Sequence, residues 1–279
     1  MLINGQTKVV GIIGDPVKHS LSPQMHNAAF NYLKLDFVYI PFHVKPESLG
    51  EAIRGMRALD MVGLNVTVPH KIEVMKYLDE VSSDAKAIGA VNTVFCKDNK
   101  CIGDNTDGRG FIRALIEDEG ITVAGKSVVI LGAGGSARAI GHSLIKKGVD
   151  RLIFCNRTVS RAEEMAKSFQ HMDVFVAGRG IIDSRDEITR ADMIINTTSA
   201  GMKQGDSLLI DPEWIRKGQI FYDIIYSPPE TLLLQAAKAR GARTINGLGM
   251  LIHQGALAFE IWTGCSAPVE VMREAILNG

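Results

Sequence analysis

The sequence has few cysteines, and those present form no metal-binding pattern. Its four cysteines, Cys96, Cys101, Cys155 and Cys265, include no CxxC pair. No histidine stands close enough in sequence to complete a zinc site with them. We therefore expect reduced, structural thiols, as is usual for a cytoplasmic protein, and no bound metal.

An excess of charge of one sign is also missing, since 31 Lys and Arg balance 31 Asp and Glu. A balanced chain has no global field to attract nucleic acid or an anionic membrane, so neither is an expected partner. No apolar run approaches the roughly 20 residues of a membrane helix. The first residues also lack the basic and apolar regions of a signal peptide. We expect a cytoplasmic protein with a small-molecule partner, and the sequence leaves monomer and homodimer both open.

What the 279 residues do contain is an alternation of strand-like and helix-like segments. Short apolar runs predict the strands of the first half, at 8–14, 37–44, 61–68, 90–96 and 101–103. Ser22 as N-cap and Pro23 in the first turn predict a helix, and residues 47–59 predict another. KDNK, between the last two strands, is typical of a hairpin turn. This alternation predicts a mostly parallel sheet covered by helices.

The pattern restarts after a predicted helix at about 106–120. About five further strands are expected, within 125–131, 151–158, 172–177, 192–198 and 219–225. Residues 178–190 have only weak periodicity, and the chain from Gly247 onward is helical in pattern. The predicted fold class is α/β with two domains, at 1–105 and 106–247. Helices at about 248–279 are expected to pack back on the first domain and complete it.

The segment VVILGAGGSARAIG contains the strongest general motif. Gly132, Gly134 and Ala137 match G-x-G-x-x-G/A directly after a predicted strand and at the start of a predicted helix. Gly132 permits the tight turn, Gly134 lets the backbone approach a pyrophosphate, and Ala137 allows close helix–strand packing. The helix start offers free N–H groups to the phosphates. A structural glycine turn is the alternative, but the flanking elements favour a dinucleotide site.

The next predicted strand distinguishes between the two nicotinamide cofactors. A site for NAD requires an acidic residue about 20 residues further on, to bind the ribose 2′-hydroxyl. The strand here ends in Asn156, Arg157 and Thr158, followed by Arg161, with no carboxylate among them. Guanidinium groups bind phosphate through paired donors, so the segment favours NADP. Solvated arginines at an exposed helix start are the alternative.

A nicotinamide enzyme also requires a group that exchanges a proton with the substrate oxygen. In NVTVPHK, Lys71 follows a predicted strand and lies near the start of a helix that Pro69 is expected to begin. Asp107, in GDNTDG, is the second candidate, although a surface lysine and a helix-capping aspartate are the plain alternatives. Neutral polar side chains at strand and helix ends complete the candidate set, namely Ser20, Ser22, Asn65, Thr67, Asn92, Tyr226 and Gln254. Spacing alone does not show that these groups meet.

Nine motifs in this order resemble the shikimate dehydrogenase family. They are GDPVKHSLSPQMHN, NVTVPHK, GAVNTV, GDNTDG, GAGGSARA, NRT, NTTSAGM, DIIYSPPET and GLGMLIHQGALAFEIWTG. The resemblance runs from near residue 10 to about residue 264. It implies an oxidoreductase that reversibly reduces 3-dehydroshikimate to shikimate with NADP, in chorismate and aromatic amino-acid biosynthesis. It also implies an N-terminal substrate domain and a Rossmann-type NADP-binding domain.

The resemblance assigns roles to individual residues. Lys71 and Asp107 match the catalytic pair, with the lysine exchanging the proton. The substrate contacts it implies are Ser20, Ser22, Thr67, Asn92, Asp107, Tyr226 and Gln254. The NADP contacts it implies are Gly132, Ala133, Gly134, Gly135, Ser136, Asn156, Arg157, Thr158, Arg161, Ile224 and Gly247. Asn65 and His70 receive no role, although His70 is the expected base by residue type alone.

Two alternative functions remain open at this point. A quinate/shikimate dehydrogenase of dual substrate and cofactor specificity is the nearer one, and the Asn-Arg-Thr segment and the two serines argue against it. A non-catalytic NADP-binding regulator is the other, and the presence of both Lys71 and Asp107 argues against that.

Overall fold

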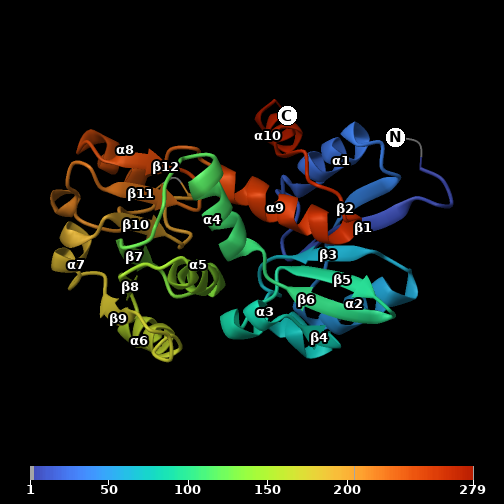
Figure 1. Cartoon of the computed structure of the whole chain (residues 1–279), viewed down its shortest axis with the longest axis horizontal. Helices are drawn as coiled ribbons and strands as arrows, with labels where there is room; N and C mark the ends of the chain where they lie inside the picture. Colours follow the sequence, from blue (N-terminus) through green and yellow to red (C-terminus); the bar gives the residue numbers. More distant parts are fainter. Residues whose placement is uncertain (1–2, 204, 279) are drawn as a thin grey trace. The chain divides into compact units, whose positions relative to one another are not determined.

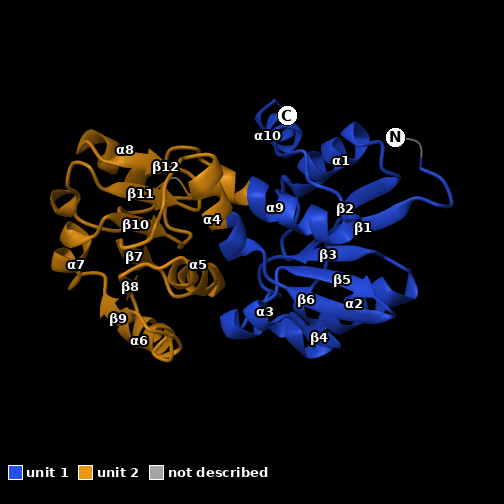
Figure 2. Ribbon diagram, in the orientation of Figure 1, with its two compact units in different colours: residues 1–110, 252–279 blue, residues 111–251 orange. Residues whose placement is uncertain are grey.

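The computed structural model describes residues 3–203 and 205–278, which form two compact units. Unit 1 comprises residues 1–110 and 252–279, and unit 2 comprises residues 111–251 (Figure 2). Each unit contains one six-stranded sheet. The predicted two-domain α/β fold is therefore confirmed. Within the described residues, no helix is both long and apolar enough to cross a membrane.

The sheet of unit 1 has the strand order β2-β1-β3-β5-β6-β4 (Figure 1). Its strands are β1 (Lys8–Gly14), β2 (Phe37–His43), β3 (Gly63–Val66), β4 (Glu80–Val81), β5 (Thr93–Lys97) and β6 (Lys100–Asp104). β1 pairs in parallel with β2 and β3, whereas β5 is antiparallel to both β3 and β6. The predicted hairpin is confirmed. Its turn residues Asp98 and Asn99 have φ values of 50° and 60°, as a tight hairpin turn requires.

Helices surround this sheet, and those from the C-terminus pack against it. They are α1 (Ser22–Tyr32), η1 (Pro46–Ser48), α2 (Leu49–Ala58), η2 (Glu73–Tyr77), α3 (Ser83–Ile88), α10 (Val269–Leu277) and the unit 1 part of α9 (Leu248–Thr263). α10 packs on α1. Trp262 of α9 donates from Nε1 to the carbonyl of Val94 over 3.2 Å. The predicted packing of the C-terminal helices on the first domain is therefore confirmed.

Two local predictions in unit 1 are wrong. Ser22 is the first residue of α1, and Leu21 is the N-cap residue; the Ser22 N–H instead donates to Oγ of Ser20 over 3.3 Å. The helix predicted to begin at Pro69 does not form, and only the 3₁₀ helix η2 follows. The carbonyl of Lys71 accepts a hydrogen bond from the N–H of Val91 over 2.8 Å. That carbonyl is therefore committed to the segment before β5, and Lys71 lies in a turn.

The sheet of unit 2 has the order β12-β11-β10-β7-β8-β9, and every pairing is parallel. Its strands are β7 (Ser127–Leu131), β8 (Arg151–Asn156), β9 (Phe175–Gly180), β10 (Met193–Asn196), β11 (Ile220–Asp223) and β12 (Arg243–Ile245). Counted from β7, this is the 3-2-1-4-5-6 order of the doubly wound dinucleotide fold. The sheet has six strands where about five were expected, because the three residues of β12 are too few to give a periodic signal.

Two helical layers cover the sheet of unit 2. The helices are the unit 2 part of α4 (Asp107–Glu117), α5 (Gly135–Lys146), α6 (Val159–Lys167), α7 (Arg185–Arg190), η3 (Pro212–Trp214) and α8 (Leu232–Ala239). Along β7 the side chains alternate: Val128 and Ile130 belong to the core under α5 and α6, and Val129 and Leu131 to the core under α7 and α8. The carboxyl ends of these parallel strands lie along one edge of the sheet, which is where ligands bind in such folds.

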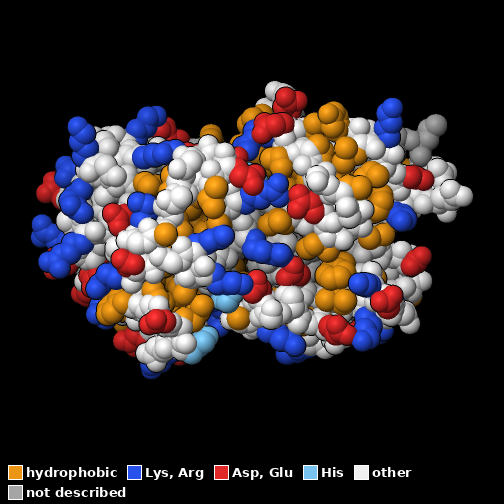
Figure 3. All heavy atoms as spheres, in the orientation of Figure 1, with side chains coloured by type: hydrophobic (Ala, Val, Ile, Leu, Met, Phe, Trp, Pro, Cys, Tyr) orange, Lys and Arg blue, Asp and Glu red, His pale blue; other side chains and the backbone are white. Residues whose placement is uncertain are grey.

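The surfaces of both units carry charges of both signs. On the face drawn in Figure 3, Lys and Arg side chains are interspersed with Asp and Glu over each unit. Some of these charges form exposed ion pairs, such as that between the guanidinium of Arg54 and Oε1 of Glu51, at 3.0 Å.

Candidate active site

The lysine and the carboxylate predicted from sequence lie side by side in unit 1. Nζ of Lys71 is 2.5 Å from Oδ2 of Asp107. Asp107 begins α4, three residues after β6 ends at Asp104, and its N–H donates to Oδ1 of Asn105 over 3.0 Å. The Lys71 side chain is 21% exposed and that of Asp107 is 7% exposed. The amine can therefore reach a ligand from outside while the carboxylate fixes its position.

Asn92 holds the other oxygen of this carboxylate. Oδ1 of Asn92 accepts hydrogen bonds from the N–H of Thr106 over 2.8 Å and from the hydroxyl of Thr93 over 2.9 Å. The amide is thereby oriented so that Nδ2 faces Oδ1 of Asp107, at 2.7 Å. Nδ2 also lies 3.4 Å from Oε1 of Gln254, on α9. Both oxygens of Asp107 thus accept hydrogen bonds, and four of the predicted site residues are brought together.

The two residues of NVTVPHK without an assigned role have structural contacts. Asn65 is buried, and its Oδ1 accepts from the Tyr39 hydroxyl over 2.8 Å. Its Nδ2 donates to the carbonyl of Asn92 over 3.2 Å and to the Thr93 hydroxyl over 3.3 Å. His70 is 1% exposed, and its Nε2 lies 2.7 Å from the carbonyl of Val44. Asn65 therefore supports Asn92 from behind, and His70 ties its turn to the segment after β2.

Ser20, Ser22 and Thr67 follow the carboxyl ends of two neighbouring strands. β1 and β3 are parallel, with Ile13 opposite Val66, so the segments that follow them leave the same edge of the sheet. The N–H of Thr67 donates to the carbonyl of Ile13 over 3.0 Å. A Cβ atom on Gly14 would come within 2.4 Å of the Thr67 methyl group, so glycine is needed there for Thr67 to approach β1.

A buried tyrosine lies next to the second serine. Ser22 is 4% exposed and Tyr39 is 2% exposed. Burial raises the pKa of the Tyr39 hydroxyl, and its interaction with the Ser22 hydroxyl lowers it to a lesser degree. Since Tyr39 donates to Asn65, this neutral phenol connects the serine segment to the polar network around Asn92.

In unit 2, the glycine motif forms the turn that joins β7 to α5. Gly132, directly after β7, has φ of +119°, and a Cβ atom there would lie 2.4 Å from Oγ1 of Thr197. Gly134 precedes α5, and a Cβ atom on it would meet nothing within 4 Å, so its backbone faces open space. α5 is 12 residues long, and its first turn contains Gly135 and Ser136. Ala133 lies between Gly132 and Gly134, before α5 begins. These features fit a pyrophosphate, because helix N-termini and glycine turns bind phosphate through backbone N–H groups.

The predicted 2′-phosphate segment follows β8 at the same edge of the sheet. Asn156 ends the strand, and its Nδ2 donates to the carbonyl of Thr158 over 3.0 Å, which closes the turn before α6. Arg157, Thr158 and Arg161 are exposed. Their donors are available to a phosphate, and no acidic residue lies between 156 and 162.

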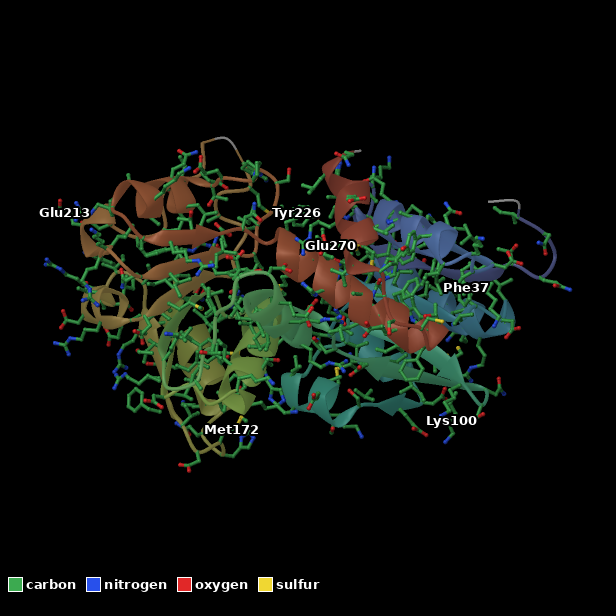
Figure 4. The ribbon with its side chains drawn as sticks, turned by 45° about the horizontal axis from the view of Figure 1, so that its top comes forward. Phe37, Lys100, Met172, Glu213, Tyr226 and Glu270 are labelled. Carbon is green, nitrogen blue, oxygen red and sulfur yellow. The ribbon has the colours of Figure 1, made fainter. Side chains whose placement is uncertain are left out.

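Ile224 and Gly247 also lie together in unit 2. A Cβ atom on Gly247 would come within 1.9 Å of the Ile224 carbonyl oxygen, so only glycine permits this approach. Ile224 follows Asp223, whose carboxylate accepts from Asn196 over 3.0 Å and from Thr231 over 2.7 Å. Burial raises the pKa of Asp223. Tyr226, labelled in Figure 4, is two residues further on in unit 2, and burial raises the pKa of its hydroxyl.

Some residues of these networks escape prediction from the sequence. Tyr39, Thr93 and Thr106 hold or orient Asn65 and Asn92, and Thr197 faces Gly132. The only signal for Thr93 and Thr197 is that they stand inside the motifs GAVNTV and NTTSAGM. Within residues 3–203 and 205–278, no group of three or more His, Cys, Asp and Glu side chains could hold a metal ion.

Comparison with protein families covers most of the chain. Residues 12–94 match the shikimate dehydrogenase substrate binding domain, residues 115–212 match shikimate / quinate 5-dehydrogenase, and residues 247–277 match the shikimate 5′-dehydrogenase C-terminal domain. A curated relative, shikimate dehydrogenase (NADP(+)) of Methanopyrus kandleri, is 49% identical and aligns over 99% of this chain and 97% of its own.

Two solved structures are similar throughout. A shikimate dehydrogenase in complex with NADP+ has a TM-score of 0.92 and 48% identity, covering 99% of this chain and 97% of that one. Shikimate 5-dehydrogenase of Listeria monocytogenes, in complex with shikimate and NAD, has a TM-score of 0.92 and 40% identity, covering 98% of each chain. The family expected from the nine motifs is confirmed: the chain belongs to the shikimate dehydrogenase family.

Proposed function

We propose that this chain is an NADP-dependent oxidoreductase that reversibly reduces 3-dehydroshikimate to shikimate. The observation that carries the proposal is the contact of 2.5 Å between Lys71 and Asp107, with Asn92 on the other carboxylate oxygen. A partly exposed amine oriented by a buried carboxylate is suited to exchange a proton with a substrate oxygen. The solved relatives named above, in complex with NADP+ and with shikimate and NAD, support this substrate and cofactor class.

The substrate is held by neutral donors and by the catalytic pair. Ser20 and Ser22 would donate to its carboxylate, from the segment after β1. Thr67, Asn92, Gln254 and Tyr226 would bind its hydroxyl groups. Neutral donors suit a polyhydroxylated acid, because they fix its orientation without the strong binding of a second ion pair.

NADPH, when bound, supplies the hydride that the substrate carbonyl carbon receives. Lys71 donates a proton to the oxygen that becomes the hydroxyl group. Asp107 accepts hydrogen bonds from Lys71 and from that hydroxyl, and so keeps both in line. Asn92 fixes the plane of the Asp107 carboxylate. In the oxidation of shikimate, Lys71 takes the proton back.

NADP is held by three segments of unit 2. The turn of Gly132, Ala133, Gly134, Gly135 and Ser136 would bind the pyrophosphate through backbone N–H groups. Asn156, Arg157, Thr158 and Arg161 would bind the ribose and its 2′-phosphate. Ile224 and Gly247 would lie near the nicotinamide. We assign the substrate to residues 1–105 with the helices of 248–279, and NADP to residues 106–247.

The test is the rate of shikimate oxidation by the purified chain with NADP, compared with quinate and with NAD. We expect the highest kcat/KM for shikimate with NADP. Equal kcat/KM values for quinate, or for NAD, would favour the dual-specificity enzyme. Binding of NADP and shikimate without turnover would favour the regulator. The oligomeric state, monomer or homodimer, and a cytoplasmic location stay predictions.

A further inference from the structure

Two cysteines face each other on the β5–β6 hairpin, outside the site described above. Cys96 of β5 is paired in register with Cys101 of β6, and their Sγ atoms are 3.4 Å apart. Lys100, labelled in Figure 4, follows the hairpin turn and is the first residue of β6. All four cysteines of the chain are free thiols.

The backbone hydrogen bonds of Cys96 and Cys101 show which kind of antiparallel residue pair they form. The N–H of Cys96 donates to the carbonyl of Val62 on its other side, over 3.1 Å. The N–H of Cys101 donates to the carboxylate of Asp79 over 2.7 Å, and its carbonyl accepts from the Asp79 N–H over 3.0 Å. The two cysteines therefore form a non-hydrogen-bonded pair, in which the Cα atoms of antiparallel strands approach to about 4.5 Å. This separation lies within the range that a disulfide bridges, of about 4.4–6.8 Å.

The two thiols differ in their surroundings. Cys101 is fully buried, whereas Cys96 is partly exposed. The guanidinium of Arg57, which is paired with Asp79, also contacts the Cys101 thiol. Burial, followed by the neighbouring sulfur of Cys101, raises the pKa of Cys96 to about 12. Cys96 is therefore held as a thiol near neutral pH, and its reaction accelerates as the pH rises, since the thiolate is the nucleophile.

We propose that Cys96 and Cys101 are a reversible redox modification site that a low-molecular-weight disulfide oxidises to an intramolecular disulfide. Cys96, the accessible thiol, loses its proton and attacks one sulfur of the oxidant, which forms a mixed disulfide and releases one small thiol. Cys101 then loses its proton and attacks the Cys96 sulfur, which releases the second small thiol. The two protons end on the two released thiols, so two protein thiols are oxidised and one small disulfide is reduced.

This oxidation should stabilise the hairpin without stopping turnover. Cys96 is four residues along the strand direction from Asn92, or about 13 Å at the rise of an antiparallel strand. The bond closes only a short loop, so the gain in the midpoint of thermal unfolding is on the order of a few degrees. We expect kcat of the oxidised protein within about twofold of the reduced protein, because the sulfurs need move by only about 1.4 Å to bond.

In the experiment, the folded full chain with the single substitution Cys265→Ser is incubated with oxidised glutathione at pH 9. Its peptides are then mapped by mass spectrometry without reduction. The expected result is a link between Cys96 and Cys101 that survives cleavage after Lys97 and Lys100 and is reversed by dithiothreitol. The Cys101→Ser variant should stop at a glutathione adduct on Cys96, and Cys96→Ser should leave Cys101 unmodified. The buried Cys155 is the internal control and should remain a thiol. A link that forms only in denaturant, or no link in the folded chain under conditions in which glutathione modifies the exposed Cys265 of the wild-type chain, would overturn the proposal.

Discussion

Removing the amine of Lys71 is the sharpest perturbation of the proposed chemistry. Lys71→Ala deletes the group that lies 2.5 Å from Asp107 and leaves the position of Asn92 unchanged. We expect kcat to fall by about 10²–10⁴, the usual contribution of a positioned acid–base group. This corresponds to about 3–5 kcal/mol of barrier, at 1.36 kcal/mol per factor of ten. KM for shikimate should change much less, because the serines, Thr67 and Gln254 remain.

The assay follows reduced nicotinamide during shikimate oxidation and extracts kcat and KM separately. Added methylamine should partly restore kcat of Lys71→Ala, since it returns an amine to the vacated space. The matched control is His70→Gln, one residue earlier, whose ring contacts the Val44 carbonyl. This control should lower thermal stability and keep kcat within a few-fold of wild type. A Lys71→Ala enzyme with near wild-type kcat, or a large loss in His70→Gln alone, would refute the role of Lys71.

Three further predictions follow from the same geometry. Arg157→Ala should raise KM for NADP by about tenfold or more and leave KM for NAD nearly unchanged, because only NADP carries the 2′-phosphate; equal losses would remove Arg157 from that role. Thr93→Val removes a hydroxyl that orients Asn92, so kcat should fall about tenfold, in line with one hydrogen bond, with Thr93→Ser restoring it; a change in stability with kcat intact would mean that Thr93 is only structural. Burial lowers the pKa of His26 to about 3, so below about pH 6.5 the unfolded state binds a proton that the folded state does not. As the pH is lowered from about 6.5 towards 3, the free energy of unfolding should therefore decrease, by up to about 1.4 kcal/mol per pH unit from this group. Denaturant titrations should show that His26→Phe flattens this slope, and an unchanged slope would contradict the assignment.

The sequence predicts the elements of this fold well where periodicity is long or a turn has special chemistry. The run of β1, the hairpin turn and the glycine turn at Gly132 are of this kind. It fails at short elements such as β12, where three residues carry no period. It also fails at Pro69, since a proline permits a helix start but the long-range hydrogen bond from Val91 to Lys71 decides the local conformation.

In the candidate site, too, the sequence predicts some residues, whereas long-range contacts decide the roles of others. Residue type and position in the chain are enough to nominate Lys71 and Asp107, but residue type alone would equally nominate His70. Only the fold reveals that His70 is buried against the Val44 carbonyl and that Asn65 contacts Tyr39 and Asn92. Supporting residues such as Thr93 act through a neighbour, so nothing in their own spacing distinguishes them from ordinary strand residues.

We propose that this chain oxidises shikimate with NADP through the Lys71–Asp107 pair. The most direct measurement is kcat/KM of the wild-type chain for shikimate with NADP, set beside quinate with NADP and shikimate with NAD. We predict that the first value exceeds both of the others by at least about tenfold, or about 1.4 kcal/mol of discrimination. A chain that binds both ligands without turnover, or that turns over quinate as fast as shikimate, would contradict it.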